Sequence, residues 1–96
     1  MHVEIAEPAD MAIRTLGQDD RQRVQAWFGH LRNWDQDPFV RDHSHPLPSS
    51  RNTYVLQTSS DLRIFFTKED DIITVFDIAK RPAILLFGPR SGEEKG

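Results

Sequence analysis

Hydrophobic and polar residues alternate over positions 2–6 at the start of the chain, which is the period of a half-buried strand. Pro8 then suits the first turn of a helix, and apolar residues recur at helical spacing from Ala9 to Leu16. Gly17 stands where a left-handed residue would end that helix. The chain is therefore expected to begin with a short strand followed by one helix.

The strongest pattern along the chain belongs to a second helix. Asp19 is expected to cap its first turn, with Gln22 three residues later completing a capping box. Apolar residues then recur on one side of the helix, while the residues between them are polar. This apolar stripe consists of Val24, Trp27, Phe28, Leu31 and Trp34. The helix should therefore pack one face against a core.

The helical pattern ends before residues 35–50, which contain three prolines among Asp, Ser and His residues. This composition predicts a loop, with Phe39 and Val40 holding it to the body of the protein. A loop of about 15 residues is long for a small domain, and such loops are often functional or mobile.

The second half of the chain has the pattern of strands. Strands are predicted over residues 53–58, 62–67 and 72–79, with short turns between them, so they should form an antiparallel meander. Residues 83–87 are either a final strand or a helical turn. The order strand, helix, helix and then three strands predicts an α+β fold, with two helices on one face of a mainly antiparallel sheet. The second helix should lie on Leu62, Ile64 and Phe66.

Composition narrows the class of protein. Ninety-six residues suit one domain, which we expect over residues 1–90, with a disordered tail over 91–96. The absence of cysteine excludes disulfides, thiolate metal ligands and a cysteine nucleophile. The longest apolar run, residues 83–87, is far shorter than the about 20 residues that cross a bilayer, and the N-terminus does not resemble a secretion signal. We therefore expect a cytoplasmic protein with no membrane partner.

The charge balance argues against a protein that binds nucleic acid over its whole surface. Twelve basic residues face fifteen acidic ones, for a net charge of −3, whereas nonspecific binding of phosphate backbones usually requires a basic excess. The second half of the chain is balanced, and most of the cations are arginines, whose forked guanidinium suits phosphate. The charge balance therefore still allows a local anion-binding site in the second half of the chain.

Several other kinds of site have weak support. His43 and His45 could share a metal with Asp42 or Asp37, or His43 could act as a general base, but a proline-flanked surface loop explains both histidines. Residues 69–71 are best explained as a solvated acidic turn rather than a Mg²⁺ site. Motifs for nucleotide binding and for a serine hydrolase are missing. We therefore expect neither a metal nor a cofactor.

Two segments carry a family resemblance. Residues 54–66, Tyr-Val-Leu followed by a short turn and Leu-Arg-Ile, resemble a hairpin of the RelE/ParE superfamily, the toxins of bacterial type II toxin–antitoxin pairs. Residues 71–81 are similar to the strand that follows in that superfamily, which typically ends in a basic residue. The resemblance implies an antitoxin partner. It also implies one of two targets: messenger RNA on the ribosome for RelE-like members, or DNA gyrase for ParE-like members.

The resemblance also implies site residues. In the ribonuclease branch, basic residues along the sheet hold the scissile phosphate, and Arg63 and Arg81 match the catalytic positions. Arg51 and Lys80 fall in regions that would bind substrate. Phe87 stands where ribonuclease members would have a tyrosine. The resemblance therefore predicts an endoribonuclease whose chemistry would depend on arginines.

Two alternatives stay open at this stage. Arg63 could be an ordinary solvent-facing strand residue that pairs across the sheet with Asp77 or another acid. The whole chain could likewise be a gyrase inhibitor, or a non-catalytic protein-binding module of toxin ancestry, which the acidic charge and Phe87 favour over a ribonuclease.

Overall fold

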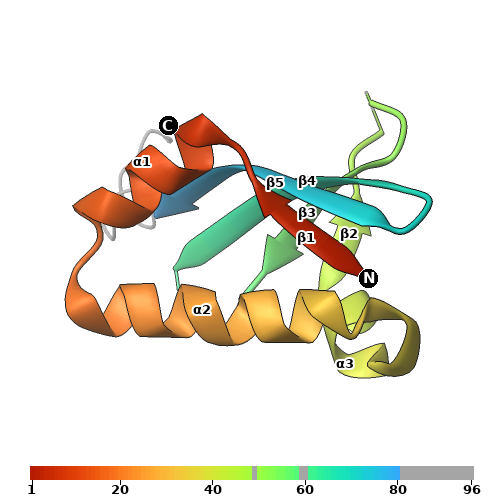
Figure 1. Cartoon of the computed structure of the whole chain (residues 1–96), viewed down its shortest axis with the longest axis horizontal. Helices are drawn as coiled ribbons and strands as arrows, with labels where there is room; N and C mark the ends of the chain where they lie inside the picture. The colour runs from red at the N-terminus through yellow and green to blue at the C-terminus, as the bar shows by residue number, and fades with distance from the viewer. Residues whose placement is uncertain (49, 59–60, 81–96) are drawn as a thin grey trace, which may run out of the picture.

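The chain folds into a layer of helices packed on a five-stranded sheet (Figure 1). The computed structural model describes residues 1–48, 50–58 and 61–80. The predicted α+β class is confirmed. In chain order the elements are β1 (His2–Ile5), α1 (Glu7–Thr15), α2 (Gln18–Arg32), the 3₁₀ turn η1 (Trp34–Gln36), α3 (Pro38–Asp42), β2 (Ser44–Pro46), β3 (Thr53–Gln57), β4 (Leu62–Glu69) and β5 (Ile72–Lys80).

The sheet is mixed, with the strand order β1-β5-β4-β3-β2. Strands β3, β4 and β5 form the predicted antiparallel meander. Strand β1, from the other end of the chain, runs parallel to β5 along one edge, and the short β2 lies antiparallel to β3 along the other. The first predicted strand is therefore present, and it closes one side of the meander.

A β-bulge in β5 changes which of its residues face the core. Phe65 of β4 lies opposite Asp77 and Phe66 lies opposite Val75, so Phe76 is an extra residue between these two pairs. The buried positions of β5 shift accordingly from Ile73 and Val75 to Ile78. The sequence pattern predicted a regular strand here and did not reveal this shift.

The core lies between α2 and the sheet, as Figure 1 shows. All six residues predicted for it are buried: Trp27, Phe28, Leu31, Leu62, Ile64 and Phe66. Trp34 falls after the end of α2, but its ring still packs edge-on against Phe66 and Tyr54 at centroid distances of 5.9 and 5.8 Å. The apolar stripe therefore continues past the end of the helix.

The junction between α1 and α2 differs from the prediction. Gly17 has φ −68° and ψ 168°, so it is extended rather than left-handed, and it is the N-cap residue of α2. Asp19 lies inside the first turn of α2, and no side chain caps that helix. Because Leu16 and Gly17 are both extended, two residues suffice to turn the chain from one helix into the next.

The loop predicted over residues 35–50 is wrong for much of its length, since it contains η1, α3 and β2. Asp37 Oδ1 accepts hydrogen bonds from the backbone N–H groups of Phe39 and Val40 at 3.0 and 3.3 Å, and Pro38 occupies the first turn. An acidic N-cap followed by proline is a strong helix start. Val40 then anchors α3 in the core.

Three predictions concern segments that lie outside the described residues. These are the turn at 59–60, the element at 83–87 and the tail over 91–96, so the domain boundary at residue 90 stays a prediction. Within the described part of the chain, no helix is both long and apolar enough to cross a membrane.

Candidate functional site

The face of the sheet that points away from the core helices is the candidate site. Its side chains alternate along each strand with the fully buried ones, and they are half-buried or exposed. We call this surface the open face. Its central side chains are Val55, Gln57, Arg63, Phe65 and Phe76.

Arg63 lies near the end of the open face where β4 begins. Its cross-strand neighbours are Gln57 on β3 and Ala79 on β5, both of them uncharged. Its Nη1 atom donates to the carbonyl of Leu62 at 3.2 Å, and the guanidinium forms no ion pair with any described residue. Arg63 therefore keeps donors available for an anion.

The pairing of Arg63 with Asp77, left open by the sequence, does not form. The bulge places Asp77 opposite Phe65 rather than opposite Arg63. Its Oδ1 atom accepts a hydrogen bond from the backbone N–H of Ile78 at 2.9 Å. The carboxylate is therefore engaged by its own strand.

Two aromatic rings lie beside Arg63 on the open face. Phe65 is two residues further along β4, and Phe76 of β5 lies next to it, with the ring centroids 6.2 Å apart and the planes at 44°. Both rings are half-buried. Aromatic side chains next to a cation are the usual platform for unpaired nucleic-acid bases. Alternation along β5 from Ile72 and Thr74 places Phe76 on this face, and the bulge adds Asp77 to it, opposite Phe65.

Lys80 lies on the opposite face from Arg63. Its cross-strand partner is the buried Leu62, and its ammonium group donates to Asp20 Oδ2 on α2 at 2.8 Å. The other oxygen of Asp20 accepts from Arg23 at 2.9 Å. Lys80 therefore ties the end of β5 to α2 and does not share a site with Arg63.

The ion pair between Asp20 and Lys80 should make stability depend on pH. The hydrogen bond from Lys80 lowers the pKa of Asp20 below its ordinary value of 3.8, so the pair stabilises the fold above that value. This stabilisation is lost as the pH falls through the lowered pKa of the folded state. When the pH is lowered from 7 to about 3, the melting temperature of Asp20→Asn should therefore fall less than that of the wild type.

Asp19→Asn is the matched control for this prediction, because Asp19 is exposed and forms no ion pair within the described residues. Its pH dependence should match that of the wild type. Asp37 would still contribute in both variants, since a hydrogen bond from His30 lowers the pKa of its carboxyl as well. Identical thermal unfolding profiles for Asp20→Asn and the wild type would show that the pair adds no stability.

The remaining predicted site residues are not gathered around Arg63. Arg51 is exposed and precedes Thr53, whereas Arg63 lies opposite Gln57, so about 13 Å of β3 separates the two ends. Arg81 and Phe87 lie outside the described residues. Arg81 follows the end of β5, where Ala79 lies opposite Arg63, and its part in the site stays a prediction.

The two histidines of the predicted loop do not form a metal site. His43 Nδ1 lies 2.9 Å from the carbonyl oxygen of Phe39, while His45 lies on the exposed edge strand β2. The described residues contain no group of three His, Asp or Glu side chains that could hold a metal ion.

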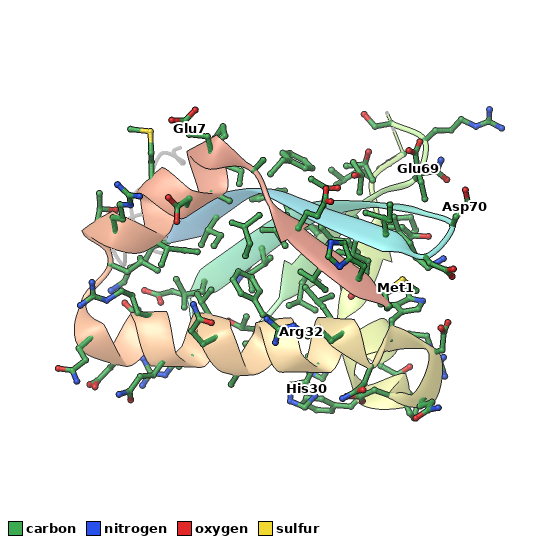
Figure 2. The ribbon with its side chains drawn as sticks, in the orientation of Figure 1. Met1, Glu7, His30, Arg32, Glu69 and Asp70 are labelled. Atoms are coloured by element: carbon green, nitrogen blue, oxygen red, sulfur yellow. The ribbon has the colours of Figure 1, made fainter. Side chains whose placement is uncertain are left out.

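His43 belongs instead to a cluster of rings where α3 packs against α2, of which the labelled His30 points away from the sheet in Figure 2. Phe39 stacks on Trp27 at 5.3 Å and lies 4.4 Å from His43. His30 donates to Asp37 Oδ2 at 2.7 Å. These contacts join α3 to α2, so we assign the cluster a structural part.

Comparisons with known proteins identify the fold. No protein-family model matches the sequence, and no curated protein matches it significantly. Solved structures do match. The isolated RelE toxin of E. coli superposes with a TM-score of 0.68 and 17% identity, over 94% of this chain and 96% of that one. A chain of the intact E. coli RelBE toxin–antitoxin complex superposes with a TM-score of 0.67 and 17% identity, over 84% of this chain and 96% of that one.

An archaeal structure agrees with this result. A chain of the RelB–RelE antitoxin–toxin complex from Methanococcus jannaschii gives a TM-score of 0.66 and 14% identity, over 90% of this chain and 99% of that one. At such low identities, the likeness establishes the fold and leaves the activity open. The chain therefore has the fold of RelE toxins, as the hairpin around Arg63 predicted.

Proposed function

We propose that this protein is the toxin of a toxin–antitoxin pair and acts as a RelE-like, ribosome-dependent messenger-RNA endoribonuclease. The fold supports the toxin assignment, because the matching structures are a RelE toxin and toxin–antitoxin complexes. The antitoxin is the proposed protein partner. The proposed substrate is messenger RNA on the ribosome.

The observation that carries the proposal is the un-neutralised guanidinium of Arg63. An arginine fork can bind two oxygens of one phosphate, and charge-assisted hydrogen bonds of this kind are about twice as strong as neutral ones. Neutral Gln57 and Ala79 lie directly opposite Arg63, and the fork forms no ion pair within the described residues. The carboxylate of Asp77, opposite Phe65, accepts a hydrogen bond from the backbone N–H of Ile78 instead. A phosphate can therefore bind without first breaking an ion pair.

In the proposed reaction, Arg63 binds the scissile phosphate and stabilises the negative charge that grows on its oxygens during cleavage. Phe65 and Phe76 support an adjacent base by stacking. No described histidine lies on a strand next to β4, since His45 is on β2, two strands away, and the ring of His43 packs on Phe39. Catalysis would therefore rest on positioning and electrostatic stabilisation rather than on a histidine acid or base.

The other predicted residues take different parts in this proposal. Arg81 would provide a second guanidinium for the phosphate, because it directly follows the end of β5. Arg51, at the far end of β3, would contact the RNA away from the scissile bond. For Lys80 we propose a structural part, since its ammonium group is bound to Asp20. Phe87 in place of a tyrosine predicts slow cleavage.

One observation favours a second function, a non-catalytic protein-binding module. The strands of the open face also carry carboxylates, including Glu4 and Glu69, which would repel the phosphates of an RNA lying across the whole sheet. This module would still bind a protein partner but would not cleave RNA.

Induced expression in a bacterium separates these functions. The ribonuclease predicts growth arrest, with protein synthesis falling within minutes while chromosomal DNA stays intact. DNA breaks preceding the fall in protein synthesis would indicate a gyrase inhibitor. Normal growth at a confirmed level of folded protein would favour the non-catalytic module.

A further inference from the structure

The open face is electrically divided along its length. Arg63 lies at one end, and the turn between β4 and β5 lies at the other, where Figure 2 shows the labelled Glu69 and Asp70 side by side. Arg63 and Glu69 are six positions apart on β4, which corresponds to about 20 Å of strand. The two ends of this surface therefore carry opposite charge.

The acidic end is hollowed. A cavity of about 470 Å³ opens there across β4, β5 and β1, and four of the side chains that line it are the carboxylates of Glu4, Glu69, Asp70 and Asp71. No lysine or arginine lines it. The carboxylates of Glu69, Asp70 and Asp71 form no ion pair within the described residues, and Glu4 has only His2, at 3.4 Å. The hollow is therefore acidic, and the cation at its rim, the Lys68 ammonium, donates to the carbonyl oxygen of Asp70 at 3.5 Å rather than to a carboxylate.

Apolar surface connects the two ends. Ile72 lines the hollow with 44% of its surface exposed, although most isoleucines are buried. Thr67 and Thr74 pair across the floor, and Phe65 and Phe76 follow toward Arg63. The one carboxylate of this stretch, that of Asp77 opposite Phe65, accepts from the backbone N–H of Ile78. A partner that covers the whole face must therefore offer cationic, apolar and anionic groups in this order.

We propose that this face is the docking surface for a segment of the antitoxin polypeptide, which places a Lys or Arg side chain in the hollow, apolar side chains on Phe65 and Phe76, and a carboxylate on Arg63. The inference rests on the proposed function for the existence of an antitoxin. Only a polypeptide carries both signs of charge with apolar groups between them. RNA would place phosphates on carboxylates, which costs binding energy.

This arrangement would also explain how the partner neutralises the toxin. A carboxylate on Arg63 occupies the donors that the scissile phosphate needs, so antitoxin and RNA exclude each other there. The hollow lies about 20 Å from Arg63 along β4, outside the phosphate site. Carboxylates in the hollow would therefore select the antitoxin without taking part in cleavage.

The first test measures affinity for the purified product of the gene adjacent to that of the toxin. In the full chain, Glu69→Gln combined with Asp70→Asn and Asp71→Asn should weaken binding at least about tenfold, the effect expected for losing a close charge pair. Glu7→Gln is the matched control, because Glu7 is an exposed carboxylate at the start of α1, at the other end of the molecule from the labelled Glu69 and Asp70 in Figure 2. It should leave the affinity unchanged.

The second test identifies the occupant directly. The chain has no cysteine, so Ile72→Cys provides a single thiol for a photocrosslinker in the hollow, and Gln25→Cys on exposed α2 provides the control. Irradiated complex should yield a crosslink at position 72 to an antitoxin peptide that contains Lys or Arg, and none from position 25.

The outcomes separate this inference from the proposed function. A complex that forms but keeps full affinity in the triple variant, or that crosslinks only from position 25, would overturn the docking site and leave the antitoxin assignment standing. If the adjacent gene product does not bind at all, the proposed partner itself is wrong. Crosslinking of position 72 to RNA in cells would assign the face to nucleic acid.

Discussion

Truncation of Phe66 to alanine should lower the free energy of unfolding by about 3–5 kcal/mol, the usual cost of removing a fully buried phenyl ring. Phe66 has no exposed surface and lies near the middle of the sheet. Its ring stacks on Tyr54 at 5.3 Å and meets Trp34 edge-on. Since small domains are stable by only about 5–15 kcal/mol, this loss is a large fraction of the total. Urea denaturation followed by tryptophan fluorescence measures it.

Phe65→Ala is the matched control, because it removes the same ring from the adjacent position on the opposite face. Phe65 is half-buried and contacts one other ring, that of Phe76, so its loss should cost well under half as much. Equal destabilisation by the two substitutions would contradict the assignment of buried and open faces.

Replacing Arg63 with alanine should abolish growth arrest and leave the melting temperature unchanged. Among the described residues, the guanidinium bonds only to its neighbouring carbonyl, so we expect the fold not to depend on it. Loss of a preorganised donor to a reacting centre typically slows catalysis by about 100-fold or more. Arg63→Lys keeps the charge but loses the fork, and should therefore fall between alanine and the wild type.

Arg21→Ala controls for the loss of one positive charge. Arg21 is exposed on α2 and, like Arg63, has no ion pair within the described residues. Its removal should leave growth arrest intact. If the Arg63→Ala protein remains fully toxic, Arg63 is not the phosphate ligand. If Arg63→Ala and Arg21→Ala both abolish growth arrest, net charge rather than position controls toxicity.

Much of the fold was predictable because the apolar residues of each long element recur at a single regular spacing. The helical spacing from Val24 to Leu31 and the alternation from Leu62 to Phe66 each identify a buried face, and the two faces meet in the core. The loop prediction for residues 35–50 failed because prolines were taken as breakers throughout. Pro38 instead starts α3, behind the capping carboxylate of Asp37.

The candidate site was less predictable, because its residues come from different strands and are brought together only by the pairing of those strands. Alternation placed Arg63 on the exposed face correctly. Lys80 looked equivalent, but its partner Asp20 lies 60 residues earlier, and no local pattern shows such a contact. Likewise, Ile78 faces the core and Asp77 the open face only because of a bulge, which depends on the register between two strands.

The most direct test of the proposed function is cleavage of a defined messenger RNA by the purified protein on translating ribosomes, with the new 5′ ends mapped by primer extension. The proposal predicts cuts within the translated region that require ribosomes, are abolished by Arg63→Ala and persist with Arg21→Ala. Intact messenger RNA in the presence of folded, wild-type protein would contradict it.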